Sequence, residues 1–225
     1  MSQTFFQEDR FRIAEQLVNV SRNFAEKGWF PATSGNLSVK LNQDPLMFGV
    51  TASGRDKESL TIHDILFVDG DSKALEPTSL KPSAETLVHA EVYKKIGAGA
   101  GAVLHVHTIY NNLISEVYAE QGSVTITDME LIKGLNIWEE GATIEVPIVE
   151  NFADIPKLAA EIGKRLDPRV PGVLIRKHGI YAWGEDVAAA KRHVQAFEFM
   201  FQYQFLYQQF LRSGNAAQLA VANAL

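Results

Sequence analysis

The sequence has 225 residues, of which 46% are hydrophobic and 21% charged, with a net charge of −6. This composition is enough for a full core, the length suits one domain spanning residues 1–225, and the negative balance disfavours a nucleic-acid-binding protein. The absence of cysteine excludes disulfides and thiolate metal ligands. Since no run of 18 apolar residues and no secretory signal pattern is found, we expect a cytoplasmic protein that contacts neither membrane nor nucleic acid.

Helices and strands are predicted along the whole chain from the spacing of apolar residues. The predicted helices cover residues 8–27, 82–96, 108–120, 129–133, 154–166 and 186–212. The predicted strands cover residues 37–41, 47–52, 65–68, 102–108, 124–127, 143–149, 173–176 and 180–183. Ser83, Asp128 and Asp186 are expected to cap three of the helices. This order predicts one α/β domain, a mixed sheet with helices on both faces, and an Ala-rich tail, residues 215–225, that we expect to be mobile.

Two histidines lie two residues apart in the strand predicted over residues 102–108. Side chains alternate along a strand, so His105 and His107 point to one side and can share a metal ion, while Leu104 and Val106 pack into the core. Two hydrogen-bonded structural histidines would give the same pattern. His178, at a break between two predicted strands, is a third candidate, and three imidazoles with an open position form a catalytic type of zinc site.

The other histidines are expected to be structural. His63 follows a turn, and His193 lies on the last helix among charged residues. His89 follows Glu85 by four residues on one helical face, so the pair could bind a metal, but we favour a packing role for His89. The Gly-Ala-Gly-Ala-Gly segment, residues 97–101, ends a helix and precedes a strand, which is the reverse of a dinucleotide-binding loop.

Small polar residues and glycines stand at the ends of the predicted strands. Backbone N–H groups beside glycines, hydroxyls and a helix N-terminus can together bind a phosphate. Each segment alone would be an ordinary turn, but their joint occurrence before the two histidines predicts a phosphate site. Positive charge could come from Lys57, Arg55 or Lys81. The other residues of the predicted site are Ser34, Gly35, Asn36, Ser53, Gly54 and Ser83.

The order of these motifs resembles the class II aldolase/epimerase family over about residues 10–210. The motifs are Ser-Gly-Asn at 34–36, Ser-Gly at 53–54, Pro-Ser-Ala-Glu at 82–85, His-Val-His-Thr at 105–108 and Lys-His-Gly at 177–179. Residues 129–134 and 176–184 look most like the members that dehydrate 5-methylthioribulose 1-phosphate in methionine salvage. One departure is Ala84, where aldolases of the family often carry serine, and it weakens one phosphate contact.

The resemblance implies a three-layer α/β/α sandwich with a central mixed, largely antiparallel sheet. It implies one zinc ion per chain, held by His105, His107 and His178, and a homotetramer with active sites at subunit interfaces. Glu130 would be the base that removes a proton beside the ketose carbonyl and then protonates the departing hydroxyl. Glu85 matches the acid/base carboxylate of the aldolases. The product would be 2,3-diketo-5-methylthiopentyl 1-phosphate.

Other interpretations stay open. A class II sugar-phosphate aldolase or 4-epimerase, acting on fuculose, rhamnulose or ribulose phosphates, would use the same zinc and the same first step. A non-catalytic relative that keeps the fold as an interaction domain would be expected to lose the metal ligands, and all three are present. Glu130 could instead be a solvated residue paired with Lys133. The aromatic residues of the last helix could line the substrate pocket or, as we favour, form a subunit contact; they are Phe197, Phe199, Phe201, Tyr203, Phe205, Tyr207 and Phe210.

Overall fold

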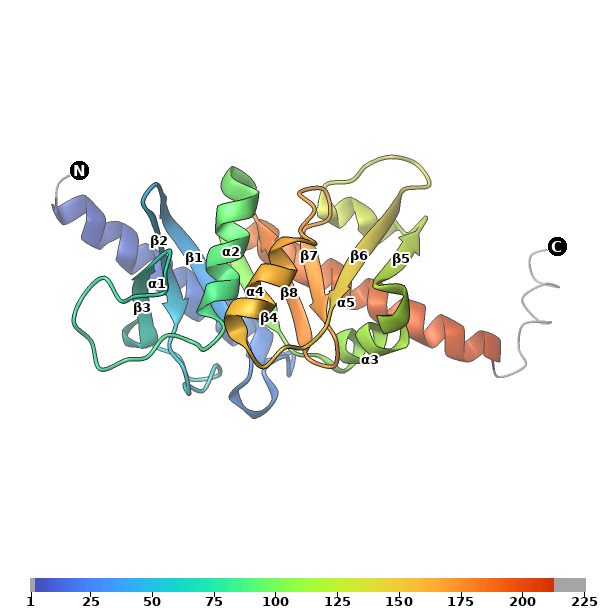
Figure 1. Ribbon diagram of the computed structural model, residues 1–225, viewed down its shortest axis with the longest axis horizontal. Coiled ribbons are helices and arrows are strands. Elements are labelled where there is room, and N and C mark those ends of the chain that lie inside the picture. The colour runs from blue at the N-terminus through green and yellow to red at the C-terminus, as the bar shows by residue number, and fades with distance from the viewer. Residues whose placement is uncertain (1–2, 213–225) are drawn as a thin grey trace.

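A computed structural model describes residues 3–212, in which helices cover both faces of an eight-stranded sheet (Figure 1). The α-helices are α1 Gln3–Ala25, α2 Thr86–Ile96, α3 Ile109–Val117, α4 Ile155–Gly163 and α5 Val187–Phe210. The strands are β1 Asn36–Gln43, β2 Leu46–Thr51, β3 Ile65–Asp69, β4 Ala102–Val106, β5 Ser123–Thr127, β6 Thr143–Val149, β7 Gly172–Ile175 and β8 Gly179–Gly184. Short 3-10 helices occupy Pro31–Thr33, Ile62–Asp64, Gly97–Gly99, Ala119–Gln121 and Glu130–Leu135.

The strands follow the order β3-β2-β1-β4-β8-β7-β6-β5. Neighbouring strands are antiparallel except for β6 and β7, which are parallel. The expected mixed, largely antiparallel sheet is therefore confirmed. These pairings make β4, β6 and β7 run in one direction and β5 in the other. The strands therefore finish at opposite ends: the C-terminal end of β5 lies on one side of the sheet along the strand direction, and the C-terminal end of β4 lies on the other (Figure 1).

Side chains of the central strand β4 alternate between two apolar layers. Leu104 and Val106 pack in the layer that contains residues of α1, α3 and α5, as predicted. Val103 packs in the other layer, with residues of α2 and α4. Figure 1 shows α2 and α4 in front of the sheet and α1 and α5 behind it. The fold is the expected three-layer α/β/α sandwich, and His105, next to Leu104 on the strand, faces the side of α2.

One helix begins later than predicted. α2 starts at Thr86 rather than at residue 82, and Ser83 is not its N-cap residue. The Ser83 hydroxyl instead accepts a long hydrogen bond, 3.4 Å, from the backbone N–H of Glu85, so residues 83–85 form a turn ahead of the helix. The correction matters because it leaves Glu85 at the N-terminus of α2, next to the end of β4.

The cap predicted at Asp128 is also wrong. Asp128 adopts a left-handed backbone conformation with φ of 54°, and the short helix expected there is the 3-10 helix Glu130–Leu135. The cap at Asp186 is confirmed, because its carboxylate accepts the backbone N–H of Ala189 at 2.7 Å. The tail predicted to be mobile, residues 215–225, lies outside the described residues. Within residues 3–212, the structure contains no helix with the length and apolar character needed to cross a membrane.

Candidate active site

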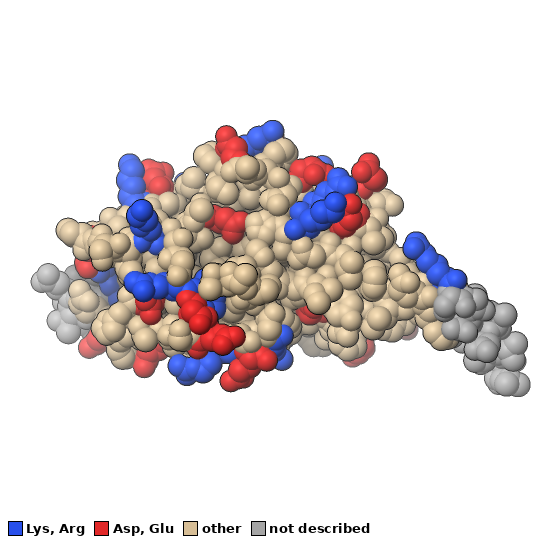
Figure 2. Space-filling model, turned by 90° about the horizontal axis from the view of Figure 1, so that it is seen from below, with Lys and Arg blue, Asp and Glu red and all other residues tan. Residues whose placement is uncertain are grey.

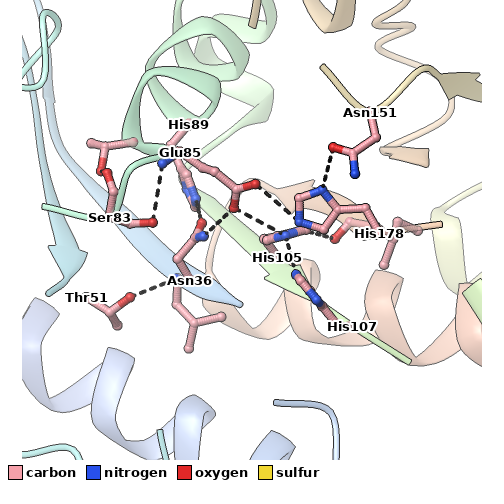
Figure 3. A network of polar contacts seen from close by, with 12 residues as sticks. Asn36, Thr51, Ser83, Glu85, His89, His105, His107, Asn151 and His178 are labelled. Atoms are coloured by element: carbon pink, nitrogen blue, oxygen red, sulfur yellow. Dashed lines mark hydrogen bonds and ion pairs between the residues drawn. The ribbon is translucent and has the colours of Figure 1, made fainter. Parts of the chain in front are cut away.

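Three histidines lie together where β4 ends and β8 begins (Figure 3). The Nε2 atoms of His105 and His107 are 2.8 Å apart, and one ring nitrogen each of His105, His107 and His178 lies within 4.8 Å of the other two. A contact this short needs either a proton between the two nitrogens, as an N–H···N hydrogen bond, or a cation that both lone pairs bind. Three neutral imidazoles are also a donor set that suits zinc. The group predicted from the sequence is therefore brought together and could hold a metal ion.

The protonation state of the cluster fits this use. Burial lowers the pKa of His105 well below its ordinary value, and the nearby His178 acts in the same direction. Burial, with the neighbouring His105, lowers the pKa of His107 to about 2. A histidine has to be neutral to bind a metal. His105 and His107 are therefore unprotonated near pH 7.

Hydrogen bonds on the far side of two rings determine which nitrogen faces the centre. The His105 Nδ1–H donates to the carbonyl oxygen of Ile180 at 3.0 Å, and the His178 Nδ1–H donates to the Asn151 side-chain oxygen at 3.2 Å. Each bond leaves the Nε2 lone pair free for a ligand. The His105 ring also stacks on Tyr181, with centroids 4.0 Å apart and an angle of 9° between the planes. Asn151 and Tyr181 were not predicted as site residues.

Glu85 faces the cluster from the N-terminus of α2, as Figure 3 shows. Its Oε2 lies 3.4 Å from the Nε2 of His105, and its Oε1 lies 3.2 Å from the Nε2 of His178. The side chain is 14% exposed, and its Oε2 accepts a hydrogen bond of 2.8 Å from the Asn36 amide. His89 is outside the metal cluster, because its ring contacts Asn36 instead. Glu85 is thus the carboxylate that this chain places beside its own histidines.

The residues predicted to bind phosphate line one cavity of 340 Å³, which also reaches Glu85, His107 and His178. Those predicted residues are Ser34, Gly35, Asn36, Ser53, Gly54, Lys57 and Ser83. The hydroxyl of Ser34 is buried and has no hydrogen-bond partner among the described residues. Since a buried polar group without a partner is costly, this hydroxyl is suited to receive a ligand.

Two of these side chains do more than face the cavity. Lys57 is buried, and its Nζ donates to the carbonyl oxygens of Thr33 (2.8 Å) and Arg55 (2.9 Å), so it holds two loops together. Burial lowers the pKa of Lys57. Asn36 is tied to Glu85 by its amide group. The side chain of Arg55 pairs with Asp64 at 3.2 Å and does not line the cavity.

A second cavity, of 1070 Å³, shares His107 and His178 with the first cavity and no other lining residue. It is bounded by His107 and His178 and by apolar side chains that include Trp29, Ile109 and Leu113. Ile109 is 75% exposed, although it lies next to the site. The α5 residues that line this cavity are Glu198 and Gln202, not the aromatic residues of that helix. The interpretation that those aromatics line the pocket is therefore not supported among the described residues.

Glu130 is not brought to the cluster within one chain. Its side chain is 77% exposed and pairs with Lys133 at 2.8 Å. It follows β5, whose C-terminal end points away from the end of β4 at which the histidines lie. A catalytic role for Glu130 consequently requires a second copy of the chain.

With this geometry established, comparison with known proteins shows the class. Residues 15–205 match the family of the class II aldolase and adducin N-terminal domain, and the chain belongs to that family. It is 54% identical to methylthioribulose-1-phosphate dehydratase of Persephonella marina over 203 residues, which are 90% of this chain and 94% of the relative. It is 50% identical to the protein of the same name from Bacillus subtilis, over 87% of this chain and 92% of the relative. The predicted resemblance is confirmed.

Solved structures support the fold. L-fuculose 1-phosphate aldolase superposes with a TM-score of 0.73 and 20% identity, covering 88% of this chain and 87% of the other. The aldolase of that name from Thermus thermophilus gives a TM-score of 0.67 at 26% identity, covering 89% of this chain and 98% of the other. The sheet and its helices are therefore shared well beyond the relatives of high sequence identity.

Proposed function

We propose that this chain dehydrates 5-methylthioribulose 1-phosphate to 2,3-diketo-5-methylthiopentyl 1-phosphate, a step of methionine salvage. The observation that supports it most is the position of the histidine cluster between two unlike cavities. The cavity with Ser34 suits a phosphate, and the cavity with Trp29 and Ile109 suits an apolar thioether. The substrate carries these two groups at its opposite ends. The two relatives described above, which are named for this reaction, are 54% and 50% identical.

We propose that His105, His107 and His178 hold one zinc ion per chain. When bound, zinc would polarise the ketose carbonyl and stabilise the negative charge that develops beside it. The hydrogen bonds to Ile180 and Asn151 would keep two of the rings in the binding tautomer. The phosphate would be held by the residues of the first cavity, namely Ser34, Gly35, Asn36, Ser53, Gly54, Lys57 and Ser83.

The reaction needs two proton movements. A carboxylate removes the C3 proton, and the C4 hydroxyl then leaves with a proton from a carboxylic acid, so that one water is lost and the resulting enol becomes the diketone. Glu85 is beside the histidines in a single chain. Glu130, on this proposal, reaches the site from a second copy. We propose that both glutamates are catalytic. Because they lie far apart within one chain, the reaction then requires the assembled protein.

We propose that the domain assembles into a homotetramer with active sites at subunit interfaces and acts in the cytoplasm. Figure 2, seen from below, shows a broad, largely uncharged area over the centre and right of this face, with many of the charged side chains gathered on its left. The outward side of α5 carries large apolar residues, including Phe199 at 52% and Tyr203 at 48% exposure. A contact between copies would cover such residues. This use of the α5 aromatics is the one favoured by the sequence.

Product analysis tests the proposed function. The zinc-loaded protein should convert methylthioribulose 1-phosphate into one diketone phosphate, and deuterium at C3 should slow the reaction, because dehydration breaks that bond. A class II aldolase is the second candidate, favoured by the position of Glu85. It would release dihydroxyacetone phosphate from this ketose or from fuculose 1-phosphate, with no primary isotope effect at C3. Dihydroxyacetone phosphate as the main product would refute the dehydratase.

A further inference from the structure

A line of buried hydrogen bonds leads from Glu85 away from the histidine cluster. The Asn36 amide contacts Glu85 Oε2 at 2.8 Å, and the Asn36 side-chain oxygen contacts the Nε2 of His89. The Nδ1 of His89 lies 2.6 Å from the Ser38 hydroxyl, which lies 2.7 Å from the Tyr93 hydroxyl. Asn36 is 3% exposed, and Ser38, His89 and Tyr93 are fully buried. Figure 3 shows Glu85 with Asn36 and His89 on one side of it and the histidine cluster on the other.

The direction of every bond in this line follows from the carboxylate. A carboxylate only accepts, so Asn36 has to turn its NH2 group toward Glu85 and its oxygen toward His89. An amide oxygen also only accepts, so the Nε2 of His89 has to carry the proton. The Nδ1 of a neutral imidazole is then an acceptor, and the Ser38 hydroxyl donates to it. The Tyr93 hydroxyl in turn donates to Ser38.

The opposite tautomer of His89 would break this order. With the proton on Nδ1, a lone pair on Nε2 would face the lone pairs of the Asn36 oxygen. Asn36 would relieve that contact by turning its oxygen toward Glu85, which would place two acceptors against each other in a buried site. Burial lowers the pKa of His89 to about 3, so the ring is neutral near pH 7 and has a single proton to place.

We propose that His89 is a positioning residue, which uses its Nε2–H to orient the Asn36 amide so that this amide holds Glu85 against the space between His105 and His178. The proposal rests on the proposed function only for the catalytic role of Glu85; the orientation of Asn36 and Glu85 by His89 does not depend on it. His89 lies outside the group of histidines that could share a metal ion, and it lines neither of the two cavities. The glutamate and the histidine four residues later on α2 are thus connected through β1 rather than through a shared ion.

The tautomer can be measured without any assay of activity. In protein labelled with 15N at histidine, long-range correlation spectra distinguish Nε2–H from Nδ1–H rings. We expect the ring of His89 to be the Nε2–H form at pH 7, with and without zinc. A Nδ1–H ring, or a doubly protonated ring, would overturn the proposal whatever the enzyme turns over. Since this experiment uses the unaltered protein, it does not depend on a variant that folds.

Variants then test the function of the bond. His89→Leu should lose about tenfold or more in kcat for diketone formation, the effect of one well-placed hydrogen bond. Its zinc content should change little. His89→Gln should recover most of the loss, because a glutamine amide can donate where Nε2 does. Equal kcat values for wild type and His89→Leu would overturn the proposal, and so would a His89→Gln protein as slow as His89→Leu.

His193 provides the matched control. It is 4% exposed, and its Nδ1–H donates to the carbonyl oxygen of Trp183, at the end of β8 away from the cluster. His193→Leu should lower Tm much as His89→Leu does and leave kcat unchanged. A similar loss of kcat in both variants would mean that lost stability, not positioning, explains the effect. If the wild-type protein forms no diketone at all, the proposed function is refuted. The tautomer measurement still tests the orientation of Asn36 by His89, because it does not depend on activity.

Discussion

A Cβ atom on Gly179 would lie 2.9 Å from Cε1 of His105 and 2.4 Å from the carbonyl oxygen of Val106. No side chain fits in that space, so glycine alone lets β8 begin directly against the end of β4. This close approach brings the ring of His178, the preceding residue, to 5.1 Å from that of His105. The Lys-His-Gly motif therefore has a packing reason for its glycine as well as a ligand in its histidine.

Replacing Gly179 with alanine should disturb both the packing and the metal. We expect the free energy of unfolding to fall by about 1–3 kcal/mol through overpacking. Zinc affinity should fall by about 10–100-fold, as when the groups that orient metal ligands are altered. Chemical denaturation and competition with a zinc indicator measure the two effects. Gly70→Ala is the control, since its Cβ would have contacts no closer than 3.3 Å. Unchanged zinc affinity in Gly179→Ala would contradict this account of the motif.

Ser34→Ala tests the phosphate cavity more cleanly than a change at Asn36, which also holds Glu85. We expect KM for the phosphorylated ketose to rise by roughly tenfold with kcat nearly unchanged, because a hydrogen bond to a charged group is lost from ground and transition state alike. Inhibition by inorganic phosphate should weaken to the same degree. Ser72→Ala is a matched control, since the Ser72 hydroxyl is also buried without a partner but lies outside the cavity. An effect of equal size at Ser72 would place the phosphate elsewhere.

The distance between Glu130 and the histidines predicts complementation between inactive subunits. Glu130→Gln should keep its zinc and lose at least about 10² in kcat, the effect of a general base. His107→Ala should be inactive for lack of metal. Co-expressed under two tags, the pair should form hybrids in which roughly a quarter of the sites are intact, since each site takes its histidines from one copy and Glu130 from another. Hybrids with no recovered activity would show that Glu130 does not act from a second copy.

Glu198 should make stability depend on pH. Burial raises the pKa of its carboxyl to about 6, whereas an unfolded glutamate titrates near pH 4.3. The folded state therefore binds this proton more tightly, and stability should fall as the pH rises from about 4.3 to about 6. In Glu198→Gln this contribution, about 1–2 kcal/mol, should be absent. Urea unfolding of zinc-free protein at pH 4.5 and 6.5 measures it, and an identical pH dependence in both proteins would contradict the assignment.

Local patterns predicted much of this site. The strand with His105 was predictable because alternation along a strand is a short-range property, although β4 ends at Val106 and His107 follows it instead of lying within it. The Asp186 cap was predictable for a similar reason. The phosphate site with Ser34, Ser53 and Ser83 was predicted from the joint occurrence of small polar segments and from the family resemblance, since no local rule places three loops around one cavity.

What was missed depends on pairing between distant segments. The contact of Asn36 with His89 joins residues 53 positions apart and exists because α2 packs over β1 in the folded chain. The place of Glu130 depends on β5 being the last strand of the sheet. Glu198 did give a signal, a charged residue between Phe197 and Phe199 in an otherwise aromatic helix. A lone charged residue between aromatic residues of a helix indicates a candidate for a buried functional position.

Titration of metal-free protein with zinc, followed by the rate of diketone formation, tests the central claim most directly. The account predicts no turnover without metal and a rate that rises linearly to a plateau at one zinc per chain. In the same titration His107→Ala should stay inactive, and His63→Ala, changed outside the cluster, should match the wild type. Full turnover in the metal-free protein, or a plateau that is the same after His107 is removed, would contradict a zinc-dependent dehydratase at these three histidines.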